Sequence, residues 1–291
     1  MPPDSLLRHA AFTRYWVGDI ASTLANQMVV LAVGWQIYDI TQSAMSLGLV
    51  GLAHFGAQLL CTLPSGHVAD RHDRRVVAFL CQLVQCASAA LLATAYVNGW
   101  LNAQHGSALI YTCVALSAAA QTFQNPAMRS LLPSLVGESL LARSIAFHAG
   151  AKKAAIIVGP ALGGAIYLLG PAAVYSSAAL MFIVAGVIMS GMPAIVASRA
   201  REPATLGYVL GGLRYIVKNP ILFGAITLDM FATLLGGAVA LLPIYAKDIL
   251  GTGPMGLGLM RSAPALGAVL ASLWLVRRPL KRNVEIGRAH V

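Results

Sequence analysis

Charged residues are scarce in this chain. Only 10% of its 291 residues are Asp, Glu, Lys or Arg, whereas 58% are hydrophobic. A water-soluble domain carries about 25% charged residues, so this composition leaves too little polar surface to cover a globule in water. The shortage of charge therefore argues against a soluble enzyme or binding module and indicates a chain embedded in a membrane.

The sequence also lacks the short motifs that carry enzyme chemistry. It contains no H-E-x-x-H pair, no G-x-S-x-G turn and no C-x-x-C pair. The ATP-binding pattern G-x-x-x-x-G-K-[ST] is absent as well, which argues against a self-contained ATP-driven pump. Its four cysteines lie in apolar stretches, at Cys61, Cys81, Cys86 and Cys113. The residues predict no metal site and no cofactor, and an integral-membrane enzyme is the weakest alternative.

Long apolar runs are what the chain has in abundance. A helix rises about 1.5 Å per residue, so about 20 apolar residues cross roughly 30 Å of hydrocarbon. Backbone amides in lipid need partners within the protein, so each run is expected to be a helix, and the alternating pattern of a membrane β-barrel is absent. Eight spans are predicted, at residues 15–38, 46–66, 76–98, 107–126, 146–169, 172–194, 221–246 and 255–276.

Basic residues lie in every second connection between the predicted spans. The net charge of the chain is +10. The connections that alternate with the basic ones contain a single basic residue, Lys247. This positive-inside pattern predicts an inner-membrane protein with both termini in the cytoplasm. Nucleic-acid binding is not expected, because it needs a basic patch on one face. The basic residues counted as cytoplasmic are Arg8, Arg14, Arg71, Arg74, Arg75, Arg129, Arg143, Lys152, Lys153, Arg199, Arg201, Arg214, Lys218, Arg277, Arg278, Lys281 and Arg282.

Two distant stretches are similar to each other. Residues 38–41 (YDIT) precede MSLGLV at 45–50, and residues 247–250 (KDIL) precede MGLGLM at 255–260. Such internal repeats are typical of transporters, although a chance likeness of two apolar helices is the alternative. The repeat predicts a six-helix transmembrane unit at 1–194, a cytoplasmic linker at 195–220 and the first two helices of a second unit at 221–284.

The last seven residues are unusual. Residues 285–291 (EIGRAHV) resemble the translated start of a common short-read sequencing adapter, so we expect them to be non-native; a genuine short tail is the alternative. On this interpretation the chain contains about eight of twelve helices. It is then expected to insert in the membrane without showing substrate-dependent proton flux.

One motif joins the second and third spans. Residues 66–75 read GHVADRHDRR and resemble the major facilitator superfamily signature G-x-x-A-D-R-x-G-R-R, with Asp73 in place of its second glycine. We expect Gly66 to let two helices approach closely and Asp70 to accept charge-assisted hydrogen bonds. The resemblance implies a transport motif, whereas a plain basic turn is the alternative. Its residues are Gly66, Asp70, Arg71, Arg74 and Arg75.

A second motif lies in the fifth span. Residues 159–164 read GPALGG and resemble the antiporter motif G-P-x-x-G-G of the same superfamily. Pro160 is expected to kink the helix, and Gly159, Gly163 and Gly164 are expected to allow close packing across the kink. The resemblance implies export by proton exchange, whereas an ordinary Gly/Pro-rich packing face is the alternative.

The stretches at 34–39 and 125–133 resemble the branch of the superfamily that contains enterobactin exporters and transmembrane secretion effectors. The likeness covers residues 10–284. It implies an all-α integral-membrane protein with the major-facilitator fold, surrounded by lipids and monomeric when full length. The implied function is secondary active, proton-driven export of a small amphipathic molecule of siderophore or drug type. A non-transporting fragment of such a protein is the alternative.

Polar residues inside the spans are the candidate proton or substrate site, because charge in hydrocarbon is costly. Asp19 and Asp229 occupy matching repeat positions and are expected to face each other across a cavity, with solvation at headgroup level as the alternative. For His54 we expect either a group that titrates near neutral pH or a histidine with a purely structural packing role. Arg261 is expected to pair with a carboxylate or an anionic substrate; in a shortened second unit, Asp229 and Arg261 are expected to face lipid or water. Four amides, Asn26, Gln27, Gln36 and Gln58, either line a cavity or join helices.

Overall fold

A computed structural model describes residues 9–102, 106–192 and 214–277, and the regular elements in these ranges are helical. The expected tail at 285–291 and most of the expected linker at 195–220 lie outside them. The elements are α2 (Ala10–Thr41), α3 (Ala44–Arg71), α4 (Arg74–Val97), α5 (Gly106–Leu135), α6 (Glu138–Tyr167), α7 (Pro171–Ser190), α9 (Pro220–Gly236), the 3-10 segment η1 (Gly237–Leu241), α10 (Leu242–Ile244), the π-helical segment η2 (Tyr245–Ile249) and α11 (Gly253–Arg277).

Six helices, α2 to α7, are long and apolar enough to cross a membrane, which confirms the first six predicted spans as helices. Several of them are longer than predicted. A helix of 30 residues such as α6 is about 45 Å long and exceeds the roughly 30 Å of hydrocarbon. Its polar end therefore stays helical beyond the apolar run. As a result Arg143, Lys152 and Lys153, which were counted with the connection before this span, lie within α6 itself.

The seventh predicted span, 221–246, is not one helix. The α-helical part ends at Gly236, and η1, α10 and η2 follow in succession. Two consecutive glycines, Gly236 and Gly237, weaken the helix here, and Pro243 removes the backbone donor that would continue it. A turn with Gly251 and Gly253 at φ +58° and +67° then leads into α11, the eighth span. The positive φ at both positions favours glycine.

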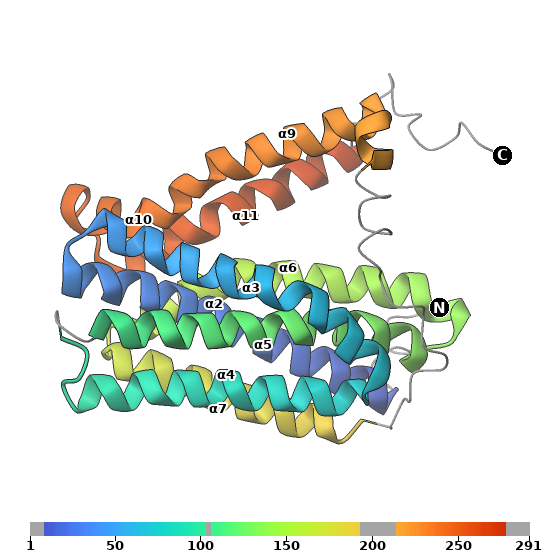
Figure 1. The fold of residues 1–291 in the computed structure, drawn as a ribbon, viewed down its shortest axis with the longest axis horizontal. Coiled ribbons are helices and arrows are strands. Elements are labelled where there is room, and N and C mark those ends of the chain that lie inside the picture. Colours follow the sequence, from blue (N-terminus) through green and yellow to red (C-terminus); the bar gives the residue numbers. More distant parts are fainter. Residues whose placement is uncertain (1–8, 103–105, 193–213, 278–291) are drawn as a thin grey trace.

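The six long helices form one bundle, shown in Figure 1. Within it α2 packs against α6 and α7, α4 against α5 and α7, and α3 against α5. One hydrophobic cluster includes Leu31, Leu92 and Tyr175, and a second, near the start of α2, includes Phe12 and Met189. A cluster of buried alanines between α2, α4 and α7 lets these backbones approach closely, as small residues do in membrane bundles.

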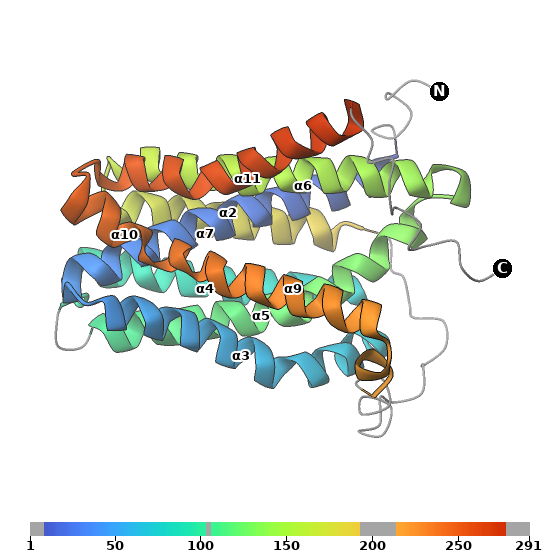
Figure 2. The same ribbon diagram turned by 90° about the horizontal axis from the view of Figure 1, so that it is seen from above.

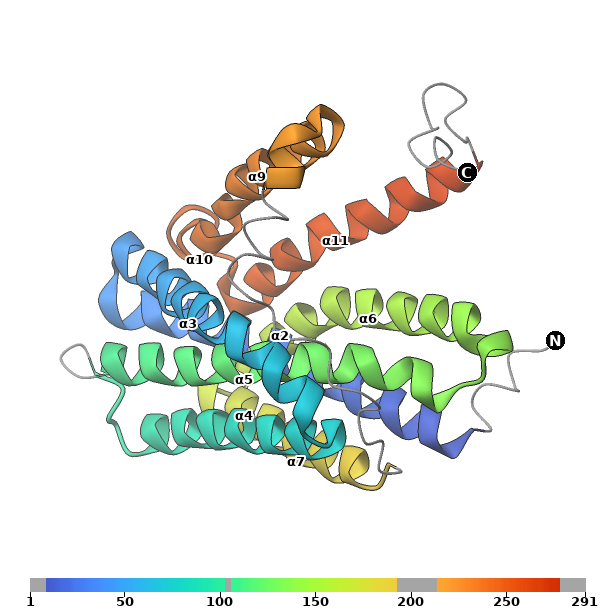
Figure 3. The same ribbon diagram turned by 45° about the vertical axis from the view of Figure 1, so that its right-hand side comes forward.

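The helices α9 and α11 lie on one side of this bundle. Helix α11 packs along α6, and both α9 and α11 diverge from the bundle toward the end where α6 begins (Figures 1 and 3). Viewed from above, α11 follows α6 while α9 crosses toward α5 and α3 (Figure 2). Large apolar side chains of α3, such as Leu60 at 79% exposed, point away from the protein. Such a surface suits contact with lipid.

Candidate functional site

A cavity of about 370 Å³ lies between α2–α5 and the α10–α11 region. Its lining is mainly apolar. The polar lining residues are Asn26, Gln27, His54, Gln85, Ser88, Ser117, Gln121 and Arg261, and no Asp or Glu is among the lining residues. Ligand pockets have volumes of about 300–1,000 Å³ and combine apolar walls with a few placed polar groups. The cavity therefore has the size and composition of a site for a small organic molecule.

Arg261 crosses from α11 to α2 at the edge of this cavity. Its Nη1 donates a hydrogen bond to the carbonyl oxygen of Val30 at 3.1 Å. A Cβ at Gly34 would lie 3.5 Å from the same Nη1, an ordinary van der Waals contact, so the guanidinium lies directly beside α2 at this position. The expectation that Arg261 faces lipid or water is therefore wrong, because α11 packs against the bundle at this point. His54, on α3, lines the same cavity.

Side-chain amides join the helices around the cavity. Gln121 donates to Oδ1 of Asn26 at 2.6 Å, and both residues line the cavity. Gln85 donates through Nε2 to Oε1 of Gln124 at 2.7 Å, and Gln124 donates to Oγ of Ser22 at 3.4 Å. Gln85 is 1% exposed, and its Oε1 has no hydrogen-bond partner among the described residues. Of the four amides expected to line a cavity or join helices, Asn26 and Gln27 line this cavity. Asn26 also joins α2 to α5, and Gln36 joins α2 to α7 by accepting a hydrogen bond from Tyr175.

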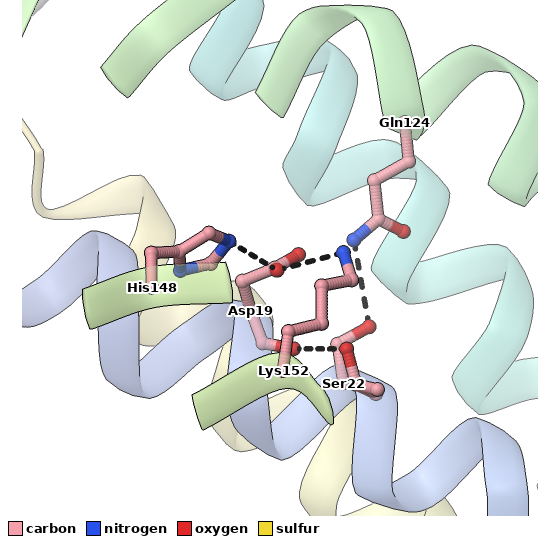
Figure 4. Close-up of polar contacts among 6 residues, drawn as sticks. Asp19, Ser22, Gln124, His148 and Lys152 are labelled. Atoms are coloured by element: carbon pink, nitrogen blue, oxygen red, sulfur yellow. Dashed lines mark hydrogen bonds and ion pairs between the residues drawn. The ribbon is translucent and has the colours of Figure 1, made fainter. Parts of the chain in front are cut away.

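Asp19 lies one turn before Ser22 on α2 and is held by two residues of α6. Its Oδ2 is 3.1 Å from Nε2 of His148 and accepts a hydrogen bond from Nζ of Lys152 at 2.9 Å. Figure 4 shows His148 and Lys152 on either side of the carboxylate, with Gln124 and Ser22 beyond Lys152. The side chain of Asp19 is 5% exposed, that of His148 11% and that of Lys152 37%. We call Asp19, His148 and Lys152 the Asp19 cluster.

The structure separates Asp229 from these groups. Asp229 is exposed on α9 and is not among the residues that line the cavity. The expectation that Asp19 and Asp229 face each other across a cavity is therefore wrong in this conformation. The reason is that α9 diverges from the bundle (Figure 3), while the carboxylate of Asp19 turns toward α6.

The glycines of the second motif lie where α6 meets α2 and α11. A Cβ at Gly159 would lie 2.6 Å from Cβ of Gln27, and one at Gly163 would lie 3.0 Å from Cα of Met28. A Cβ at Gly164 would lie 2.6 Å from the carbonyl oxygen of Pro254 on α11. The expected close packing across Pro160 is confirmed.

The first motif is built differently from the expectation. Helix α3 continues to Arg71, so only His72 and Asp73 separate it from α4. A Cβ at Gly66 would have no neighbour within 4 Å among the described residues, so the expected close approach of helices at Gly66 is not present in this part of the structure. The side chain of Asp70 lies outside the described part of the structure.

Asp73, the position that departs from the superfamily pattern, caps α4. Its Oδ1 accepts from the backbone N–H of Arg75 at 3.1 Å, and its Oδ2 pairs with Nε of Arg75 at 2.8 Å. Arg75 also donates to the carbonyl oxygen of Met192 at 3.0 Å, and Arg74 to that of Ser130 at 2.9 Å. These two arginines therefore tie the start of α4 to α5 and to the end of α7.

Sequence reasoning missed several residues of the two sites, namely His148, Lys152, Gln85, Gln121 and Gln124. His148 and Lys152 are four residues apart on α6, so they share one helix face, and that spacing within a largely apolar helix was an available signal. Nothing local distinguishes Gln85 or Gln124 from other helix amides. Their contacts depend on how α4 and α5 pack.

The chain was also compared with known proteins. The family described as transmembrane secretion effector matches residues 3–286. Macrolide efflux protein A of Streptococcus pyogenes is 21% identical over 276 residues, which cover 91% of this chain and 65% of that protein. Enterobactin exporter EntS of Escherichia coli O1:K1 is 24% identical over 274 residues, covering 92% of this chain and 64% of that protein. This chain thus spans just under two thirds of the length of these relatives.

A solved structure supports the fold. It is a bacterial homologue of the iron transporter ferroportin in an inward-facing state, with a TM-score of 0.60 and 19% identity, over 94% of this chain and 70% of that one. Together with the six membrane-length helices, this likeness confirms the all-α fold and a multi-pass membrane protein. The chain belongs to the transmembrane secretion effector family of the major facilitator superfamily.

Proposed function

We propose that the product of the complete gene is a secondary active exporter of small amphipathic molecules in the bacterial inner membrane, and that this chain supplies much of its transport path. The observation that carries the proposal is the cavity between the six-helix bundle and α10–α11. Alternating access needs a site between two parts that move against each other. The names of the relatives, a macrolide efflux protein and an enterobactin exporter, agree with export.

Proton coupling is the finer part of the proposal. Transporters place proton-binding side chains inside the bundle, where charge must be paired. Asp19 is such a group, because its carboxylate is enclosed by His148 and Lys152. The chain of Gln85, Gln124 and Ser22 connects the cavity wall to the turn of α2 that follows Asp19. This hydrogen-bond chain ends at Ser22, one helical turn from Asp19, so a substrate that moves the Gln85 side chain would disturb α2 next to the Asp19 cluster.

The antiporter-like motif supports the same proposal. Gly159, Gly163 and Gly164 hold α6 tightly against α2 and α11. Because α6 also supplies His148 and Lys152, a movement of α11 on α6 during alternating access would reach the Asp19 cluster. The glycines would then transmit movement between the two parts of the transporter.

The test is transport in proteoliposomes loaded with a pH-sensitive dye. Enterobactin and a macrolide, the compounds in the relatives' names, are offered to the complete gene product and to the 291-residue chain in parallel. We expect substrate-dependent proton flux from the complete product and its loss in Asp19→Asn. Lys153→Gln, a change of one charge on an exposed residue of the same helix, is the control. Export that persists with unchanged proton flux in Asp19→Asn would rule out this coupling site.

The orientation is tested separately. The distribution of Lys and Arg supports the proposal that both termini lie in the cytoplasm. Reporter fusions after Asn98 and Gly170 are expected to report outside the cell, and a fusion after Arg201 inside. A cytoplasmic signal at Gly170 would contradict the proposed topology.

A further inference from the structure

Among the described residues that line the cavity, Arg261 carries the permanent charge. His54 lines it as well, whereas no described aspartate or glutamate does. An isolated cation in a low-dielectric site is costly unless it has a partner. In the described part of the chain Arg261 forms no ion pair, and its hydrogen bond to Val30 uses one of its five N–H donors. The cavity therefore presents unused cationic donors to whatever enters it.

This arginine is also held in place. The carbonyl oxygen of Val30 accepts a hydrogen bond from its Nη1, and the same nitrogen lies beside Gly34 on α2. A planar guanidinium that is already oriented binds a carboxylate or a similar acid group through two parallel hydrogen bonds. Because the guanidinium is already oriented toward α2, the side chain loses little additional conformational entropy when such a group binds.

The opposite wall offers an acceptor. Gln85 on α4 is almost fully buried and lines the cavity, and its Nε2 is engaged by Gln124. Its Oε1 is left without a partner among the described residues. A buried acceptor without a partner is less stable than a satisfied one. Because this oxygen has almost no accessible surface, a ligand hydroxyl or N–H would satisfy it once the Gln85 side chain rotates toward the cavity.

We infer that the cavity selects an amphipathic organic anion, whose acid group pairs with Arg261 and whose hydroxyl or N–H group donates to Gln85. The remaining walls, which include Val30, Val50 and Leu92, contact its apolar body. This inference names the substrate class of the proposed exporter and so rests on that function. Binding at equilibrium, however, requires neither export nor proton flux. The inferred substrate class and the proposed export function can therefore fail independently.

The test measures equilibrium binding to the purified 291-residue chain in lipid nanodiscs by isothermal titration calorimetry. The probe is 6-hydroxy-2-naphthoate, which has one acid group, one hydroxyl group and an apolar ring system. Its matched controls are the neutral 6-hydroxy-2-naphthamide and the unhydroxylated 2-naphthoate. We expect the acid to bind about tenfold more tightly than the amide, as one charge-assisted pair allows. We expect the hydroxyl group to add a further few-fold.

Variants assign these preferences to residues. Arg261→Gln is expected to remove the preference for the acid over the amide, and Arg261→Lys to keep part of it. Gln85→Met is expected to remove the preference for the hydroxylated acid over 2-naphthoate. Lys153→Gln changes the net charge by the same amount as Arg261→Gln but lies outside the cavity, so it is expected to retain both preferences. Size-exclusion profiles and melting curves establish that each variant is folded.

The comparison of ligands on the unmodified chain keeps the test decisive even if Arg261→Gln does not fold. Equal affinity for the acid and the amide would overturn the inference, as would an unchanged preference in a folded Arg261→Gln variant. Equal affinity for the hydroxylated and unhydroxylated acids would show that Gln85 does not bind the hydroxyl group of the ligand. Selective acid binding without transport by the complete gene product would retain the inference and overturn the proposed function instead.

Discussion

Asp39, near the end of α2, forms an ion pair with Lys247 of η2, 208 residues later in the chain. Beside this pair Tyr38 donates a hydrogen bond to Asp248. Residues 38–39 and 247–248 occupy matching places in the sequence repeat, so the two contacts are crossed: the first residue of each stretch contacts the second of the other. Reciprocal contacts of this kind are what a twofold relationship produces. We call these four residues the crossed pair.

The crossed pair joins α2 to η2 at one end of the bundle, whereas α9 and α11 diverge from the bundle at the other end (Figure 1). Under the proposed function, these contacts would hold the two parts of the transporter together on one side of the membrane. We predict that Asp39→Lys impairs export by the complete gene product, and that adding Lys247→Asp restores part of it. The double variant restores the attraction between the same two positions, with the charges exchanged. Initial export rates at matched expression check this. A double variant as impaired as the single one would show that the ion pair does not contribute.

The Asp19 cluster contributes to stability as well as to the proposed coupling. Removing one partner from a fully buried ion pair costs about 3–5 kcal/mol. Lys152 is 37% exposed and can turn toward water, so we predict a smaller loss, about 2 kcal/mol, for Asp19→Asn. Unfolding titrations in mixed micelles measure it. Asp229→Asn, at an exposed site, is the control and should change stability by less than about 0.5 kcal/mol.

The glycines of the two motifs should respond differently to alanine. Gly164→Ala brings a Cβ to 2.6 Å from the carbonyl oxygen of Pro254, which is backbone and cannot rotate away. We predict a loss of about 1–3 kcal/mol, as is usual for overpacking. Gly66→Ala meets nothing within 4 Å and lies inside α3, so it should keep or slightly raise the melting temperature. A large loss at Gly66 would contradict the described packing of α3.

The turn between α3 and α4 allows a comparison of two aspartates. Asp73 caps α4 and pairs with Arg75, so Asp73→Ala should lower stability by about 1 kcal/mol, the usual cost of losing a cap. Asp73→Asn keeps a capping oxygen and should lose less. For transport we expect Asp70→Asn to be more damaging than Asp73→Asn, because Asp70 matches the superfamily signature. Equal transport losses at matched expression would remove the reason to single out Asp70.

Several features of this protein are determined by the sequence alone. The scarcity of charge and the apolar runs predicted a helical membrane protein, because hydrocarbon forces every backbone amide into a local hydrogen bond. The helices α4 and α7 lie close to their predicted ranges. Motif spacing indicated the family, and glycines next to Pro160 indicated close packing. Each of these inferences depends on local chemistry, which a linear pattern records.

Only the tertiary structure decided which polar groups meet. Asp19 was a candidate from its position in an apolar run, yet its partners, His148 and Lys152, are 129 and 133 residues away in sequence, and Lys152 had been assigned to a connection. Arg261 entered the cavity because α11 packs on α6 and α2, whereas Asp229 stayed outside because α9 diverges. Periodicity records which residues are apolar. It does not record which face of a helix another helix will cover, and that choice decides whether a charge in the membrane is paired, lines a cavity or remains exposed.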